Sequence, residues 1–217
     1  AVNPTTVMGA TKMLGERLCI SRDHAKGSHE TTISCVRFGN VLGSRGSIIP
    51  LIRNQIKNGD SVTLTNEEMR RFFMSISDAA NLVLKSMVLA QGGEIFVLKM
   101  PVVLIKDLLE VLIEEFAPKF RKDPNSIKME KIGPRVGEKL NEDLISPIEF
   151  EYCYETDDMY IVFPPLALNS KHPSSKDFSM YRKVKVDKDF NYSTIDKIPL
   201  GKEGIRKILE CLNLNDV

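Results

Sequence analysis

The sequence lacks long apolar runs, a strong net charge and a dense set of metal-binding or disulfide-forming residues. No apolar stretch approaches the roughly 18–20 residues that a membrane-spanning helix needs, so we expect no transmembrane segment. Lysine plus arginine total 30 and aspartate plus glutamate total 29, which leaves a formal net charge of +1. This balance argues against binding of nucleic acid or anionic membranes through bulk electrostatics.

The chain has only four cysteines and three histidines, scattered without CxxC or other metal-ligand spacing. They are Cys19, Cys35, Cys153, Cys211, His24, His29 and His172. This pattern indicates neither a disulfide framework nor a zinc site, and reduced thiols in a cytoplasmic protein are the expectation.

The glycine-rich turn that holds a dinucleotide pyrophosphate, GxGxxG, is also missing. Gly43, Gly46 and the pair Gly92-Gly93 do not form it. We therefore expect no complete nicotinamide site from this chain's own residues. The sequence enters a helix-like pattern within a dozen residues of Ala1, and from this we expect a fragment of a longer protein.

What is present is ordinary globular material, 42% hydrophobic and 27% charged. Apolar residues at helical spacing and local cap or stop signals predict helices, in residues 3–26, 47–59, 75–93, 105–120 and 201–212. Asn3 is the expected cap of the first helix, Ser77 of the third, and Gly59 the expected stop of the second.

Runs rich in β-branched and apolar residues predict the strands, in residues 31–43, 61–65, 93–100 and 127–133, with one strand or two short ones in 152–165. Residues 134–145 are expected to form a loop and short helix, and 166–183 to be irregular. The alternation favours an α/β fold over the first hundred residues, followed by an α+β part.

Five segments occur in order and at natural spacing, and together they carry a family resemblance. They are "AVNPTTVMGATKMLGE", "VRFGNVLGSRGSIIPLIRNQI", "RRFFMSISDAANLVLKS", "GGEIFVLKMP" and "GPRVGEKLNEDLI". The chain resembles the nucleotide-sugar 4,6-dehydratases of surface-polysaccharide synthesis, within the extended short-chain dehydrogenase/reductase superfamily. The inverting UDP-N-acetylglucosamine 4,6-dehydratases and capsular polysaccharide enzymes are the branch it resembles most, over most of residues 1–165 and in the C-terminal tail.

The resemblance implies the C-terminal half of an NAD(P)-binding Rossmann fold in residues 1–105, with substrate loops in 41–75. A smaller α+β substrate-binding domain would occupy residues 106–217. It further implies NADP or NAD as cofactor, a UDP-sugar as substrate, a homo-oligomeric full-length enzyme, and an acid-base Asp-Lys pair upstream of Ala1.

In such an enzyme C4 of the sugar is oxidised, water is eliminated across C5–C6, and hydride returns to C6. Two alternatives stay open on the sequence alone. One is a UDP-N-acetylhexosamine 4-epimerase, which shares the oxidation step. The other is a non-catalytic remnant that binds a UDP-sugar weakly or only pairs with a partner chain.

Met8 and Lys12 are four residues apart, so they share a helix face. By resemblance, most relatives have a tyrosine at the position of Met8, where it takes the C4 hydroxyl proton. A thioether has no proton to exchange, but a subgroup that includes capsule enzymes also has methionine there. The resemblance thus assigns Met8 and Lys12 to the catalytic and cofactor-binding site, with Lys12 orienting the nicotinamide ribose. A core-filling Met8 and a merely solvated Lys12 are the structural alternatives.

Asn40 and Arg45 follow a predicted buried strand, at the sheet end where α/β proteins bind ligands. An amide and a guanidinium among small neighbours can meet hydroxyl and phosphate oxygens. By resemblance both contact the substrate. The alternative is a strand-terminating turn with a surface arginine.

The remaining assignments come from two further segments. By resemblance, Thr65 and Met69 lie at the uridine pocket and Arg71 approaches the UDP, whereas the neighbouring Arg70 is expected to be solvated. Arg135 and Glu138, three apart in "GPRVGEKL", would bind the diphosphate or uracil end and the ribose hydroxyls. A local surface ion pair is the alternative for this last pair.

Overall fold

The computed structural model describes residues 2–28, 30–44, 46–164, 181–184, 192–210 and 212. The chain divides into two compact units, each built from three separate segments. Unit 1 comprises Ala1–Phe38, Ala79–Lys99 and Asp143–Asp196, and unit 2 comprises Gly39–Asp78, Met100–Glu142 and Lys197–Val217. The expected division into residues 1–105 and 106–217 is contiguous, whereas these units interleave along the chain, and it stays a prediction. In unit 2, β6 (Val102–Leu104) runs directly into α4 (Ile105–Phe116).

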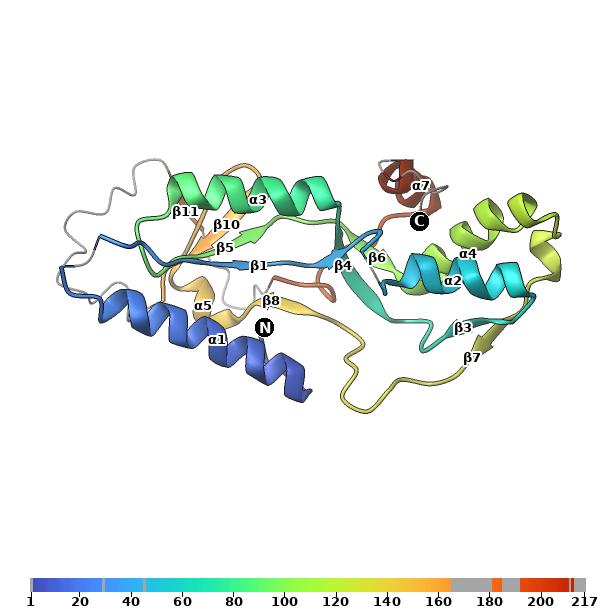
Figure 1. Ribbon diagram of the computed structural model, residues 1–217, viewed down its shortest axis with the longest axis horizontal. Coiled ribbons are helices and arrows are strands. Elements are labelled where there is room, and N and C mark those ends of the chain that lie inside the picture. Colours follow the sequence, from blue (N-terminus) through green and yellow to red (C-terminus); the bar gives the residue numbers. More distant parts are fainter. Residues whose placement is uncertain are drawn as a thin grey trace. The chain divides into compact units, whose positions relative to one another are not determined.

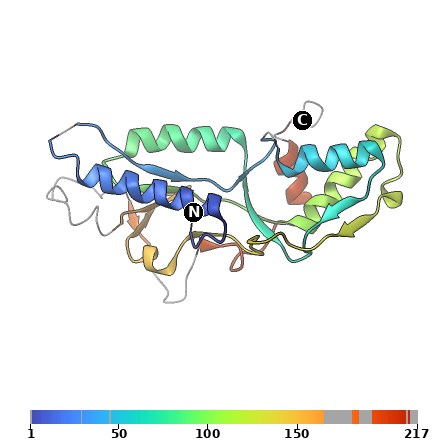
Figure 2. The same cartoon turned by 60° about the horizontal axis from the view of Figure 1, so that its bottom comes forward.

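Unit 1 contains a five-stranded mixed sheet in the order β1-β5-β10-β9-β11. Its strands are β1 (Cys35–Arg37), β5 (Ile95–Leu98), β10 (Met159–Val162), β9 (Cys153–Glu155) and β11 (Arg182–Lys183). β1 and β5 pair in parallel, and the other pairings are antiparallel. Figures 1 and 2 both show α1 (Val7–His24) and α3 (Ile76–Leu89) on opposite sides of β1, so this part of unit 1 is layered helix, sheet, helix. Unit 1 also holds α5 (Pro147–Phe150) and the two-stranded pair of β8 (Asp143–Ile145) and β12 (Tyr192–Ser193).

Unit 2 has a three-stranded sheet in the order β2-β4-β6 and a separate parallel pair, β3 with β7. These strands are β2 (Asn40–Val41), β4 (Arg70–Met74), β6, β3 (Val62–Leu64) and β7 (Met129–Lys131). The helices are α2 (Ile48–Asn58), α4, α7 (Lys202–Glu210) and two short 3-10 turns, Pro118–Phe120 and Pro124–Ser126.

Apolar faces of the helices of unit 2 form its hydrophobic core. Ile49, Ile52 and Ile56 recur at helical spacing on α2 and are fully buried against α4 residues such as Leu108 and Leu112. This is the amphipathic pattern that predicted both helices. As expected from the sequence, α2 ends at Gly59, whose left-handed φ of 87° suits a residue without a Cβ.

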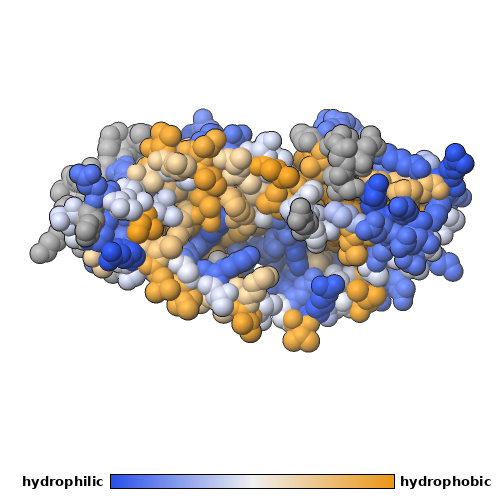
Figure 3. Space-filling model, in the orientation of Figure 1, coloured by the Kyte–Doolittle hydropathy of each residue, from blue (hydrophilic) through white to orange (hydrophobic). Residues whose placement is uncertain are grey.

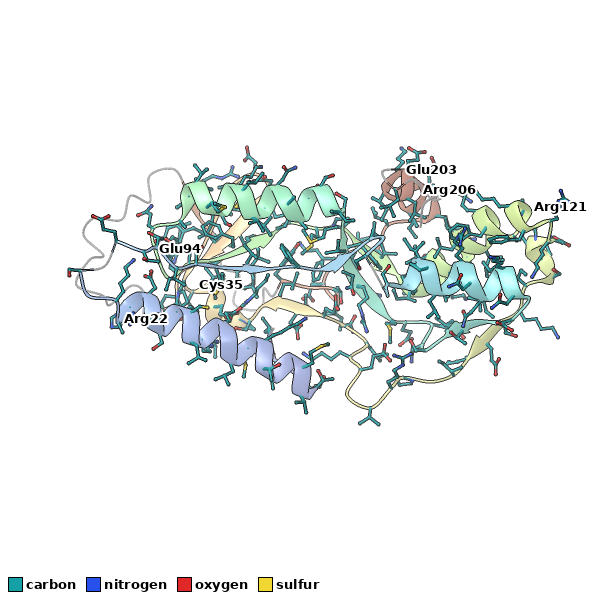
Figure 4. The ribbon with its side chains drawn as sticks, in the orientation of Figure 1. Arg22, Cys35, Glu94, Arg121, Glu203 and Arg206 are labelled. Atoms are coloured by element: carbon teal, nitrogen blue, oxygen red, sulfur yellow. The ribbon has the colours of Figure 1, made fainter. Side chains whose placement is uncertain are left out.

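Charged side chains join α7 to α4 at the surface of unit 2. Lys202 Nζ lies 2.8 Å from Glu110 and 3.1 Å from Glu114, and Arg206 also contacts Glu114. Figure 4 shows Arg206 with Glu203 on α7. Because these groups are exposed to water, each pair contributes little to stability, about 0–1 kcal/mol.

The strand predicted over residues 31–43 is two strands in different sheets. β1 pairs with β5 in unit 1, whereas β2 pairs in parallel with β4 in unit 2. Gly39, between them, lies against Phe72 and Met100: a Cβ there would come within 2.9 Å of the Phe72 carbonyl oxygen. Only glycine permits this approach without displacement, and the chain changes sheets at this residue.

Two predicted helix caps are wrong by one half-turn to one turn. α1 begins at Val7 with Thr6 as its cap, whose hydroxyl accepts from the Gly9 N–H at 3.1 Å, and not with Asn3. α3 is capped by Ser75 and not by Ser77. The Ser75 hydroxyl accepts from the Asp78 N–H, and the Asp78 carboxylate accepts from the Ser75 N–H, each at 3.0 Å. Reciprocal contacts of this kind satisfy more free N–H groups than a lone hydroxyl can.

The remaining segments resolve the alternatives left open by the sequence. Residues 152–165 contain two antiparallel strands, β9 and β10. The short helix expected in 134–145 is absent, and this stretch is irregular until β8 begins at Asp143. Most of 166–183, with His172, lies outside the described residues, as do His29 and Cys211. Among the helices of the described ranges, none is long and apolar enough to cross a membrane.

Candidate functional site

Asn40, at the start of β2, has its side-chain amide fixed by two acceptors in unit 2. The Asn40 Nδ2 group donates to the Phe72 carbonyl oxygen at 3.1 Å and to the Glu142 carboxylate at 3.1 and 3.3 Å. The same carboxylate accepts from the backbone N–H of Phe72 at 3.3 Å. Asn40 is thus held against β4 by Glu142, a residue that no motif in the sequence marks.

Arg71, on β4, is held by the loop that precedes β8. Its guanidinium donates to the carbonyl oxygens of Arg70, Leu140 and Lys139, at 2.8, 3.1 and 2.7 Å. Its Nε lies 3.5 Å from Glu142. Its side chain is only 11% exposed, so Arg71 is a largely buried cation. Its hydrogen bonds connect the loop before β8 to strand β4. Arg70, expected to be solvated, is half-buried as well.

Arg135 and Glu138 form a tight turn in the same loop. The Glu138 carboxylate accepts from the backbone N–H of Arg135, and the Glu138 N–H donates to the Arg135 carbonyl oxygen, each at 2.9 Å. The second carboxylate oxygen of Glu138 lies 3.9 Å from the Arg71 guanidinium. The contact of Glu138 with Arg135 thus involves the backbone, and the Arg135 side chain itself is exposed.

These residues form one group, which we call the Asn40 cluster: Asn40, Arg71, Arg135, Glu138 and Glu142. Burial raises the pKa of Glu142 above its ordinary value, although the charge of Arg71 and the hydrogen bond from Asn40 oppose this rise. The cluster combines amide and guanidinium donors with carboxylate acceptors. Such a set can recognise an oxyanion and a hydroxyl-bearing group together.

Thr65 and Met69 lie close to each other, but Met69 belongs to the core of unit 2. The Thr65 hydroxyl is 3.3 Å from the Met69 sulfur, and Met69 is 3% exposed among core side chains. Thr65 is half-buried. A uridine contact by either residue stays a prediction, and Arg45 lies outside the described residues.

Met8 and Lys12 lie on α1 in unit 1, and both are exposed. Met8 is 67% exposed, so it does not fill the core in this structure. The next residue on their helix face, Glu16, is buried and forms a bidentate pair with Arg37, at 2.7 and 2.8 Å. Arg37 therefore fixes the rotation of the helix that carries Met8 and Lys12.

Arg37 lies at the centre of a second charged group that the sequence did not reveal. Besides Glu16, it donates to the Glu149 carboxylate at 2.7 and 2.9 Å and to the Leu144 carbonyl oxygen. Burial alone would lower the pKa of Arg37, but its hydrogen bonds to Glu16 and Glu149 more than reverse this and raise it. These three residues are far apart in sequence and have no motif spacing, so only the fold brings them together.

The described residues include no candidate metal-binding site. Within the described ranges, no group of three His, Cys, Asp or Glu residues is arranged to hold a metal ion. Burial raises the pKa of the Cys35 thiol to about 12, with nearby Cys19 and Glu16 adding to the rise. This thiol is therefore a poor nucleophile at neutral pH.

Comparison with known proteins gives a family match over residues 1–164, to the family described as polysaccharide biosynthesis protein. An uncharacterized membrane protein of Methanocaldococcus jannaschii is 53% identical over 87% of this chain and 58% of its own length. An inverting UDP-N-acetylglucosamine 4,6-dehydratase of Campylobacter jejuni is 33% identical, over 98% of this chain and 60% of its own. A UDP-glucose 4-epimerase of Rickettsia canadensis is 34% identical, over 98% and 59%.

Among solved structures, the X-ray structure of Pen from Bacillus thuringiensis matches with a TM-score of 0.86 and 39% identity. The match covers 98% of this chain and 60% of that one, so the chain spans about three fifths of such relatives. The α/β fold class predicted from the sequence is confirmed by this likeness and by likeness to Rossmann-fold dehydratases and epimerases. The family match covers well over half of the sequence, and the chain belongs to the polysaccharide biosynthesis protein family.

Proposed function

We propose that this chain contributes the nucleotide-binding part of an NAD- or NADP-dependent enzyme that modifies a UDP-sugar for polysaccharide synthesis. The favoured reaction is the 4,6-dehydration of UDP-N-acetylglucosamine, with inversion at C5. Relatives that match nearly the whole chain carry this activity in their names. They are about two thirds longer than the chain, so the proposal concerns the complete enzyme.

The observation that supports this proposal most strongly is the Asn40 cluster. Asn40, Arg71 and Glu138 were assigned to substrate from three separate sequence segments. In unit 2 they share contacts with one another or with Glu142. We infer that the cationic groups of Arg71 and Arg135 bind the diphosphate, and that the Asn40 carbonyl oxygen accepts from a hydroxyl of the nucleoside, because the Asn40 NH2 group already donates to Phe72 and Glu142. Glu138 then accepts from the ribose hydroxyls.

The cofactor can be matched only in part to the residues present. Lys12 on α1 is exposed and has three N–H donors, which suit the hydroxyls of a nicotinamide ribose. The sequence has no GxGxxG turn to cradle a pyrophosphate. The residues of this chain therefore fit the nicotinamide end of NAD or NADP and not its pyrophosphate. When bound, the cofactor supplies hydride transfer at C4.

Product analysis tests the proposed activity. The complete enzyme is incubated with UDP-N-acetylglucosamine and NADP or NAD, and the products are identified by NMR and mass spectrometry. A product that has lost one water and carries a C4 ketone and a C6 methyl group is expected. Deuterium from solvent at C5, with inverted configuration, would identify the inverting reaction.

A UDP-sugar 4-epimerase is the second candidate, because relatives named UDP-glucose 4-epimerase match the chain about as well as the dehydratase does. In the same assay it would return a C4 epimer of unchanged mass. Nucleotide binding without either product would support the third reading, a non-catalytic UDP-sugar-binding protein.

A further inference from the structure

Glu142 contacts both Asn40 and Arg71 directly. It accepts from Asn40 Nδ2, lies 3.5 Å from Arg71 Nε and accepts from the Phe72 backbone N–H between them. Asn40 belongs to β2, whereas Phe72 and Arg71 belong to β4. Glu142 therefore accepts hydrogen bonds from two neighbouring strands of one sheet, β2 and β4.

We propose that Glu142 is a positioning residue that fixes the Asn40 amide and the Arg71 guanidinium relative to each other for binding of a nucleoside diphosphate. This inference rests on the proposed function, because it assigns a role to Glu142 within that nucleotide site. Glu142 itself is not proposed to touch the substrate. It acts through the two side chains that it orients.

The amide of Asn40 explains why orientation matters. An amide presents both a carbonyl acceptor and an N–H2 donor, and these ends can be exchanged by rotation of the side chain. Glu142 and the Phe72 carbonyl oxygen both accept hydrogen bonds from Nδ2, so they fix which end faces them. The Asn40 carbonyl oxygen is directed away from Glu142 as a consequence, and it is this acceptor end of the amide that meets a hydroxyl of the nucleotide, while Arg71 meets the phosphates.

The cation is constrained in the same way. Two Arg71 nitrogens, Nη1 and Nη2, donate to backbone carbonyl oxygens, and the Nε side faces Glu142. The positive charges of Arg71 and Lys139 offset part of the cost of burying the Glu142 carboxylate. The carboxylate of Glu138 lies on the Arg71 side of this group, 3.9 Å from the guanidinium. The Glu142 carboxylate thus restricts rotation of the Asn40 amide and of the Arg71 guanidinium.

Two substitutions separate this role from simple charge repulsion. Glu142→Gln keeps an oxygen acceptor for Asn40, whereas Glu142→Ala removes it. If Glu142 positions these side chains, the Kd for UDP, measured by calorimetry at pH 7.5 on the full chain, should rise about fivefold to tenfold for Glu142→Ala. Glu142→Gln should give an intermediate rise. Glu130→Ala, which removes an exposed carboxylate on β7, is the matched control and should leave the Kd within about twofold.

The complete enzyme gives a second measurement, because a positioning residue for substrate binding should raise KM more than it lowers kcat. The side-chain NH2 signals of Asn40 in NMR spectra report its orientation directly. They should shift in Glu142→Ala and persist in Glu142→Gln. An unchanged or tighter Kd in Glu142→Ala would overturn the inference, because Glu142 would then merely compete with the phosphates. If the wild-type chain binds no UDP, the proposed nucleotide site fails as well, and the two failures are thereby told apart.

Discussion

Arg37 pairs with two glutamates inside unit 1, and each residue of this group needs the others. The side chains of Arg37, Glu16 and Glu149 are 4%, 7% and 13% exposed. Burying these charges is costly, and the cost is offset only while all three are hydrogen-bonded. The sequence could not reveal this group, because a lone Arg within a predicted strand carries no signal for its partners.

Replacing Arg37 by methionine should therefore destabilise the chain strongly. Arg37→Met leaves Glu16 and Glu149 buried without their cation, and we expect a loss of about 3–5 kcal/mol in the free energy of unfolding at pH 7. Urea denaturation followed by circular dichroism measures it. A loss below about 1 kcal/mol would show that the two carboxylates find other partners or reach water.

The pH dependence of stability should carry the signature of Glu149. Burial alone would raise its pKa, but the hydrogen bonds and charge of Arg37 outweigh this and lower it. A carboxyl with a lowered folded-state pKa contributes stability above its unfolded pKa, about 4.3, and loses it as the pH falls through the folded value. Glu149→Gln should reduce the slope of unfolding free energy against pH below about pH 4.3. A slope equal to that of the wild type would contradict the assigned shift.

Two exposed basic residues should affect different ligands of the complete enzyme. Arg135→Ala should raise KM for the UDP-sugar by about tenfold, because it removes a cation placed at the diphosphate. Lys12→Ala should mainly weaken use of NAD or NADP. Steady-state kinetics with each ligand varied in turn distinguishes them, and unchanged constants in both variants would remove these assignments.

At the scale of elements, the sequence predicted the helices of unit 2 and the separate strands β3 and β7 well, although not that these two strands pair in parallel. Strong apolar periodicity and the Gly59 stop carried that information. The sequence-based prediction failed where tertiary contacts determine the strand boundaries, as in the continuous strand expected over residues 31–43. Nothing in "TTISCVRFGNVLG" indicates that Gly39 approaches Phe72 and Met100 and that the chain there passes from one sheet to another.

Gly39 should accordingly tolerate no side chain. Gly39→Ala would place a Cβ 2.8 Å from the Met100 sulfur and 2.9 Å from the Phe72 carbonyl oxygen, so we expect a loss of about 1–3 kcal/mol in unfolding free energy. Gly15→Ala is the matched control, because its Cβ on α1 would meet no atom within 4 Å. It should be neutral or stabilise by about 0.5–1 kcal/mol. Equal effects of the two changes would contradict the close approach at Gly39.

At the scale of the whole molecule, unit 1 leaves large apolar side chains exposed on both of its long helices. On α1, Leu14 and Leu18 are 58% and 61% exposed, and on α3, Met87 and Val88 are 72% and 85% exposed. Apolar surface is visible over α3 in Figure 3. The sequence predicted α1 from the helical spacing of apolar residues such as Leu14 and Leu18. Helical periodicity identifies a helix without stating what covers it.

The exposed apolar side chains of α1 and α3 favour association of one chain with another. The 217-residue chain should therefore show a mass that rises with concentration in size-exclusion chromatography with light scattering. The double variant Leu18→Glu and Val88→Glu should reduce this rise. A monomer at every concentration tested would contradict the prediction.

The candidate site could be predicted from the sequence only where family-like segments carried it. Asn40, Arg71, Glu138 and Arg135 were proposed in this way, and their contacts with substrate stay predictions. Glu142 was missed, because a single glutamate in "LNEDLI" has no distinguishing neighbours and acquires its meaning only from contact with β2 and β4. The same limit applies to any residue that acts by orienting another.

A crystal structure of the chain with bound UDP or UDP-N-acetylglucosamine tests the central claim most directly. We expect the diphosphate oxygens within hydrogen-bond distance of the Arg71 and Arg135 side chains and a nucleoside hydroxyl within that distance of the Asn40 carbonyl oxygen, with Glu142 still accepting from Asn40 Nδ2. A nucleotide bound elsewhere, with the Asn40 cluster unchanged and untouched, would contradict it.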